Sequence, residues 1–193
     1  MKKLPEPDKR GALSLEAAIA ARRSVRSFSP EELSDEQISQ LLWAAQGITA
    51  PHRGFRASPS AGATYPLETF IVMASGVFRY RPNEHALRQE KNADLREELC
   101  RAALGQPCVK QAPAVIVLAA VYERTSARYG QRAKRYVHME AGHVAENIQL
   151  QAVAAGLGSV PVGAFDDDRV EKVLGLAWHE HALYLIPVGR PKA

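Results

Sequence analysis

The chain has 193 residues, 46% of them hydrophobic, so it can bury a core without disulfides or metals, and we expect one domain over residues 1–193. The net charge of +4 is spread along the chain without a block of like charges, which argues against nucleic-acid binding. Because Cys100 and Cys108 have no metal-ligand spacing, and no signal peptide or bilayer-length apolar run is visible, we expect a cytoplasmic protein without a membrane segment.

The N-terminal part predicts an extended arm followed by two helices. Residues 1–13 contain two prolines, which disfavour a helix. A serine cap predicts the first helix over about 14–23. Ser34 and Gln37 have the spacing of a capping box, and the second helix should end at Gly47.

The middle of the chain predicts a hairpin and a buried strand. Residues 69–74 and 77–81 read as two strands joined by a turn at 75–76. A helix should begin at Asp94 with Glu97 and end at Gly105. The continuous apolar run 114–121 predicts a central strand that is covered on both faces.

The last third predicts the longest helix, over about 132–155, and then strand 159–165, a helix from Asp168 to Gly175 and strand 182–188. Helices and strands alternate irregularly, and a hairpin interrupts them. The fold class expected from this order is α+β, with a mixed β-sheet flanked by helices.

Residues 22–26, RRSVR, place three guanidinium groups around one hydroxyl. Basic residues favour a helix C-terminus, which accounts for Arg22 and Arg23. Arg26 lies beyond that helix. If Arg22 and Arg26 converge with Ser24, they form a fork-type phosphate site of the kind that arginine favours.

Two segments are rich in small residues. The run RASPSAGATYP at 56–66 is either a plain loop or backbone that lies flat against a ligand. The run GSVPVGAF at 158–165 fits a bulge or an edge strand, and equally backbone amides offered to a flat ligand. Arg190 and Lys192 follow the last strand, which can aim them into a site.

The histidines do not predict a metal site. His138 and His143 are five residues apart, so they cannot share one face of a helix. His179 and His181 lack a third ligand. The sequence has no GxSxG, P-loop or GxGxxG motif and no marked nucleophile, which indicates that a bound cofactor carries the chemistry.

Taken in chain order, four segments resemble the nitroreductase superfamily of FMN enzymes: SLEAAIAARRSVRSFSPEELSDEQISQLLWAAQGIT, RASPSAGATYPLETFIV, YVHMEAGHVAENIQLQAVAAGLGSVPVGAF and YLIPVGRP. The closer likeness is to the SagB/ThcOx-type branch, which includes dehydrogenases that oxidise azolines to azoles. The loop reads SAGATYP and lacks the asparagine typical of nitroreductases. The resemblance implies a nitroreductase-like mixed sheet, assembled as an intertwined homodimer with two FMN sites at the interface.

The resemblance also implies which residues bind FMN. Arg22 and Ser24 would lie toward the phosphate and ribityl chain, with Arg23 beside them and Arg26 at the pyrimidine edge. The partner subunit would contribute a loop made of Pro59, Ser60, Ala61 and Gly62. The other side of the ring would meet Pro161, Val162, Gly163 and Ala164, with a backbone amide near N5, and the phosphate site would be completed by Arg190 and Lys192.

The implied function is an FMN-dependent oxidoreductase with ping-pong hydride transfer through flavin N5. The enzyme would use NAD(P)H to reduce a small electrophile such as a nitroaromatic or quinone, or would dehydrogenate an azoline-like substrate. Lys134 and Tyr136 are candidate catalytic residues, and Tyr65 and Tyr129 are further candidates for the substrate pocket. The alternative is a non-catalytic FMN-binding carrier or sensor.

Overall fold

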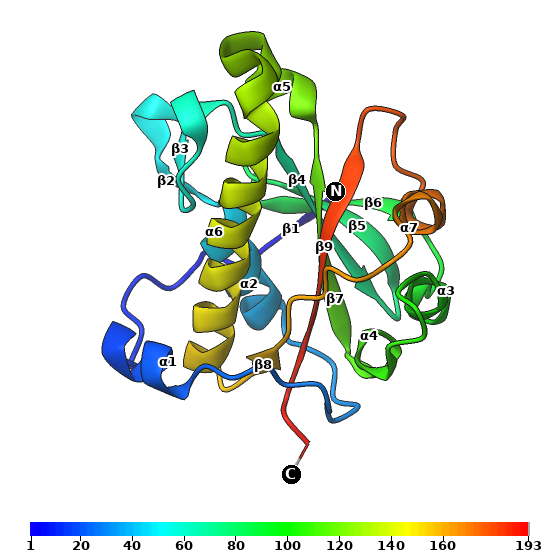
Figure 1. Ribbon diagram of the computed structural model, residues 1–193. Helices are drawn as coiled ribbons and strands as arrows, with labels where there is room; N and C mark the ends of the chain where they lie inside the picture. The colour runs from blue at the N-terminus through cyan, green and yellow to red at the C-terminus, as the bar shows by residue number, and fades with distance from the viewer. Residues whose placement is uncertain (193) are drawn as a thin grey trace.

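A seven-stranded sheet forms the centre of the computed structural model, which describes residues 1–192 (Figure 1). Across the sheet the strands are β1 (Lys2–Lys3), β6 (Ala86–Lys91), β5 (Gly76–Arg81), β4 (Leu67–Met73), β7 (Ala114–Ala120), β9 (His181–Gly189) and β8 (Gly158–Ser159). These strands pair antiparallel, and an isolated parallel bridge joins Ser24 to Ser159. A separate two-stranded ribbon pairs β2 (Ile48–Ala50) with β3 (Phe55–Arg56).

Helices cover both faces of this sheet (Figure 1). One face is covered by α2 (Asp35–Gln46) and α6 (Ala133–Ala154), and the other by α3 (Arg96–Ala102), α4 (Pro107–Gln111) and α7 (Asp167–Leu174). In addition, α1 (Leu15–Ala21) packs beside α6, and α5 (Tyr122–Tyr129) precedes α6 in the chain. The expected α+β fold, with a sheet flanked by helices, is confirmed, but the pairs of named strands in residues 1–192 are antiparallel where a mixed sheet was expected.

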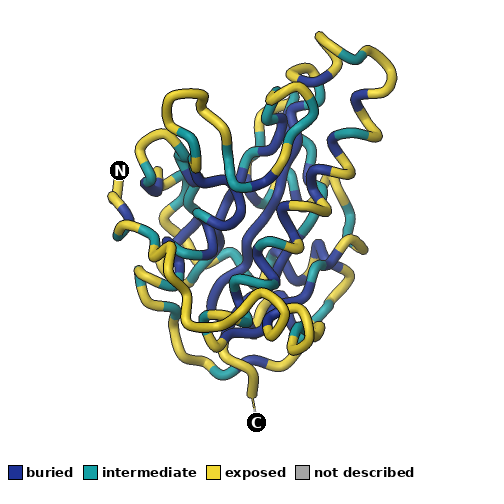
Figure 2. The backbone as a smooth tube through the Cα atoms, turned by 90° about the vertical axis from the view of Figure 1, so that its left-hand side faces the viewer, coloured by how far each residue is buried: buried dark blue, intermediate teal, exposed yellow. Residues whose placement is uncertain are grey.

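Strand β7 is the central strand that the apolar run predicted. All seven of its residues are buried, because β4 and β9 flank it and helices cover both faces. Ile116 and Leu118 belong to the core under α2 and α6, whereas Val115 and Val117 belong to the core under α3, α4 and α7. Figure 2 shows the buried residues concentrated along the centre of the molecule. Each such aliphatic side chain contributes roughly 1.5–3 kcal/mol by burial.

Two helices were predicted to begin at a capping serine, and both predictions are confirmed. The Ser34 hydroxyl accepts a hydrogen bond from Gln37 N, and Ser34 N donates to the Gln37 side chain at 3.0 Å, which completes the capping box of α2. The Ser14 hydroxyl accepts from Ala17 N at the start of α1. Two other helices begin one or two residues away from the predicted position. The residue before α3 is Leu95 and not Asp94, and the residue that caps α7 is Asp166 and not Asp168.

Other local predictions need correction. Residues 159–165 do not form one strand: only Gly158–Ser159 pairs regularly, and a single bridge joins Val162 to Leu185. The predicted arm is extended, but it also adds β1 to the sheet edge and buries Leu4. Strands β1, β2, β3 and β6 and helices α4 and α5 were not predicted.

None of the helices in residues 1–192 has the length and hydropathy needed to cross a membrane.

Candidate functional site

The RRSVR segment begins where α1 ends and turns toward α6. Arg22 is the C-cap of α1, and its Nη1 donates to Gln149 Oε1 at 3.4 Å, while its Nε lies 3.8 Å from Glu146 Oε1. Arg23 turns back and donates to the carbonyls of Ala20 and Arg22. Arg22 is thus held by α6, whereas Arg23 serves the end of its own helix.

The rest of this segment lies against β8. Val25 N donates to Ser159 O at 3.0 Å, next to the bridge between Ser24 and Ser159. A Cβ on Gly158 would lie 2.5 Å from Val25 Cγ2, so a side chain at residue 158 would push the two segments apart. The glycine therefore permits this close approach.

The end of the chain runs beside residues 27–29. Ser29 N donates to Arg190 O at 2.9 Å, and Lys192 N donates to Ser27 O at 3.0 Å. The exposed Arg190 side chain forms an ion pair with Glu31 at 2.8 Å. Three of the four segments singled out in the sequence, 22–26, 158–164 and 190–192, therefore meet at one edge of the fold.

The segment 161–164 presents free backbone donors. Val162 exchanges two backbone hydrogen bonds with Leu185, and Ala164 O accepts from Gln106 Nε2 at 2.8 Å. Gly163 and Ala164 are exposed, and no residue within 1–192 accepts a hydrogen bond from either N–H. These two amides are available to a ligand.

The loop 59–62 lies elsewhere in the same chain. A Cβ on Gly62 would lie 2.7 Å from the Tyr129 hydroxyl, and the loop packs on α5 and on the first half of α6. It neighbours Glu140, nine residues before Gln149, which separates it from the Arg22 contact by roughly 14 Å along the helix. The structure therefore does not bring this loop to the other three segments within one chain.

Lys134 and Tyr136 lie on different sides of α6. Lys134 lines a cavity of about 720 Å³ together with Gly163, Tyr122, His138 and His181. In this cavity the Tyr122 hydroxyl and His138 Nε2 are 2.7 Å apart, sharing a hydrogen bond. Tyr136 instead packs edge-on against Tyr129, with ring centroids 5.1 Å apart, beside the loop 59–62. The two residues do not form a pair within one chain.

Glu140 was not predicted from the sequence, and it is 2% exposed in the middle of α6. Burial raises its pKa to about 7, and Ser60, Arg56 and Gln46 partly oppose the rise. The sequence could have indicated this residue, because it is a single acidic residue among the apolar residues of one face of α6. Among residues 1–192, no group of three or more His, Cys, Asp or Glu side chains is placed to hold a metal.

This carboxyl should make the free energy of unfolding depend on pH. The folded pKa of about 7 lies above the ordinary 4.5 of the unfolded chain, so between these values the folded protein binds more protons. The stability should fall as pH rises through this window, by up to about 3 kcal/mol in total. In Glu140→Gln, urea unfolding at about pH 5 and pH 8 should show a smaller fall than in wild type. Parallel pH profiles would contradict this assignment.

The family of the chain follows from comparison with known proteins. The model of the nitroreductase family matches residues 19–190, so the chain belongs to the nitroreductase family and is an oxidoreductase. The protein of Methanocaldococcus jannaschii named "Putative nitroreductase MJ1384" is 44% identical over 184 residues, which cover 92% of this chain and 91% of that protein.

Two further comparisons support the fold and the branch. The crystal structure of a protein from Ralstonia eutropha, described as a "putative nitroreductase", superposes with a TM-score of 0.91 at 30% identity, covering 100% of this chain and 90% of that one. The microcin B17-processing protein McbC of Escherichia coli is 27% identical over 157 residues, or 75% of this chain and 57% of McbC. The likeness to the SagB/ThcOx-type branch is thereby confirmed.

Proposed function

We propose that this chain is an FMN-dependent oxidoreductase that works by ping-pong hydride transfer. The observation that carries the proposal is the convergence of RRSVR, the segment 158–164 and the C-terminal basic residues at one edge of the fold. Within this proposal, residues 1–193 act as one FMN-binding domain. NAD(P)H would reduce the flavin, and a nitroaromatic or quinone would reoxidise it. Alternatively, an azoline-like substrate would be dehydrogenated.

The residues at this edge fit the two ends of FMN. Arg22, Arg26 and Arg190 supply cations, of which Arg22 and Arg190 suit a phosphate through charge-assisted hydrogen bonds. The exposed N–H groups of Gly163 and Ala164 suit the polar edge of a flat ring, and the small side chains let it approach the backbone. When bound, FMN supplies reversible hydride acceptance at N5.

The protein would direct this chemistry through charge and shape. A fixed cation such as Arg26 near the pyrimidine edge would stabilise negative charge that develops there on reduction. An amide donor from Gly163 or Ala164 would orient the ring. The 720 Å³ cavity beside Gly163 would admit the donor and then the acceptor, with Lys134 and Tyr122 as its polar wall.

A homodimer would complete the site. Leu15 and Ile19 of α1 are 61% and 56% exposed, and Met139 of α6 is 53% exposed. A Cβ on Gly142 would meet nothing within 4 Å, so a second copy can approach the exposed side of α6 closely at this residue. Packing there would bury these apolar side chains and bring the loop 59–62 of the partner subunit to the flavin.

Anaerobic mixing with NADPH tests the proposal. An enzyme of this kind should lose its visible flavin absorption on addition of NADPH and recover it when a quinone or nitroaromatic is added. A yellow protein whose colour persists with both NADPH and NADH would favour the FMN carrier or sensor, or a different donor. A protein that neither contains nor takes up FMN would contradict the proposed function.

A further inference from the structure

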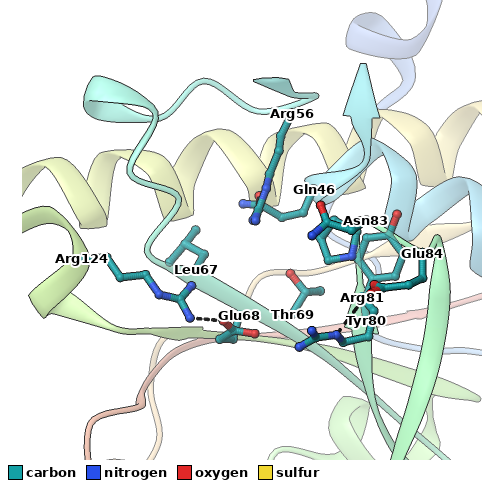
Figure 3. Close-up of a pocket in the computed structure, with 11 residues that line it drawn as sticks. Gln46, Arg56, Leu67, Glu68, Thr69, Tyr80, Arg81, Asn83, Glu84 and Arg124 are labelled. Carbon is teal, nitrogen blue, oxygen red and sulfur yellow. Dashed lines mark hydrogen bonds and ion pairs between the residues drawn. The ribbon is translucent and has the colours of Figure 1, made fainter. Parts of the chain in front are cut away.

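A polar cavity of about 270 Å³ lies between strands β4 and β5, the turn after β5, α5 and β3 (Figure 3). It is distinct from the edge where the RRSVR segment meets β8. The Arg56 guanidinium points into the cavity next to Gln46, and Thr69 lies farther along the wall, near Glu68 and Tyr80 (Figure 3).

One arginine of the cavity wall forms no ion pair in the described part of the chain. Of its three arginines, Arg124 pairs with Glu68 at 2.5 Å and Arg81 pairs with Glu84 at 3.9 Å. Arg56 forms no ion pair with any residue in 1–192. It donates to Gln46 Oε1 at 2.9 Å and stacks on the ring of Tyr65. Arginine keeps its charge even when it is partly buried.

Two buried side chains of the same wall lack hydrogen-bond partners. Thr69 is 3% exposed and Gln46 is 1% exposed, and within the described chain neither Thr69 Oγ1 nor Gln46 Nε2 has a partner. Buried polar groups are seldom left unsatisfied in folded proteins, because desolvation without a hydrogen bond is unfavourable. Within residues 1–192, the cavity therefore combines two buried donors that have no hydrogen-bond partner with an arginine that forms no ion pair, and the Glu140 carboxyl lies close enough to Arg56 and Gln46 for both to lower its pKa.

We propose that this cavity binds a small monocarboxylate, whose oxygens accept hydrogen bonds from Arg56, Thr69 Oγ1 and Gln46 Nε2. A planar carboxylate suits the guanidinium fork. A single negative charge suits the one arginine of the wall that forms no ion pair with the described residues. The carboxylates of Glu68 and Glu84 in the same wall would repel a dianion such as phosphate.

The cavity is connected to the loop 59–62 by a short chain of contacts. Arg56 N donates to the Tyr65 hydroxyl at 3.1 Å, Arg124 donates to Tyr65 O at 3.0 Å, and Tyr65 N donates to Ser60 Oγ at 2.9 Å. A bound carboxylate should therefore also change the affinity for FMN. This last expectation alone rests on the proposed function.

Calorimetric titration with sodium acetate and sodium glycolate, each against sodium chloride at equal ionic strength, tests the site. The full chain should bind at least one of the two carboxylates saturably, with or without FMN. Arg56→Gln should raise the Kd roughly tenfold or more, and Thr69→Val, which replaces the hydroxyl with a methyl group of similar size, roughly threefold. Arg53→Gln removes an exposed arginine outside the cavity and should leave the Kd unchanged.

Three results would overturn the proposal. The first is an absence of saturable binding for both compounds. The second is unchanged binding in Thr69→Val and Arg56→Gln, which would place the anion elsewhere. The third is a crystal that is soaked in whichever carboxylate binds in solution and holds only water beside Arg56. A colourless protein that binds glycolate would support the carboxylate site and contradict the FMN proposal. Failure of the carboxylate proposal can therefore be distinguished from failure of the proposed function.

Discussion

Replacing Arg22 with alanine should weaken FMN binding by roughly tenfold to a hundredfold. A charge-assisted hydrogen bond to a phosphate contributes about 1.5–3 kcal/mol, and the Arg22 guanidinium is held in place by α6. The dissociation constant for FMN, measured by fluorescence titration of the flavin-free protein, gives the result directly.

The matched control is Arg169→Ala. Arg169 is an exposed arginine on α7 whose ion pair is local, with Asp166, so its loss changes the net charge equally without touching the site. It should bind FMN as the wild type does. Equal flavin occupancy in Arg22→Ala and Arg169→Ala would place the phosphate somewhere else.

Replacing Gly62 with valine should remove both flavin binding and dimerisation. Gly62 has φ +60°, a conformation that costs about 1–2 kcal/mol for residues with a Cβ and more for a β-branched one. The new Cβ would also lie 2.7 Å from the Tyr129 hydroxyl and 3.0 Å from Arg128 Nη1. The loop 59–62 would have to move, and in the proposed dimer it touches both the flavin and the second subunit.

A control separates strain from displacement of the loop. Gly105 has φ +74°, and a Cβ added there would meet no atom within 4 Å, so Gly105→Val carries the backbone strain without the collision. It should lower thermal stability and leave flavin content and size unchanged. A Gly62→Val protein that purifies yellow and dimeric would refute the role given to this loop.

Much of the fold could be predicted because its signals are local. The capping box of Ser34 and Gln37, the apolar run of β7 and the long apolar stripe of α6 each determine an element within a few residues. Strand β6 was not predicted because its sequence, ALRQEK, has neither an apolar run nor β-branched residues. This segment forms a strand through its pairing with β5 and β1. Helix α5 was not predicted because Val121, the residue before it, provides no side-chain cap and the helix is mostly polar.

The candidate site was predictable only in pieces. The composition of 22–26 and 158–165 marked both segments, but nothing local indicates that Ser24 lies beside Ser159, a juxtaposition set by the whole sheet. Arg56 and Thr69 were missed because the burial of a polar side chain depends on tertiary packing. The role proposed for the loop 59–62 could not be predicted from local sequence either, because it depends on contacts with a second copy of the chain.

The proposed function depends most on the dimer, because two copies of the chain would together hold FMN. Size-exclusion chromatography with light scattering and an absorbance spectrum of the same peak tests this most directly. We predict a mass near twice the chain mass of 21.1 kDa, with about one FMN for each chain. A colourless species of single-chain mass that takes up no added FMN would contradict the proposal.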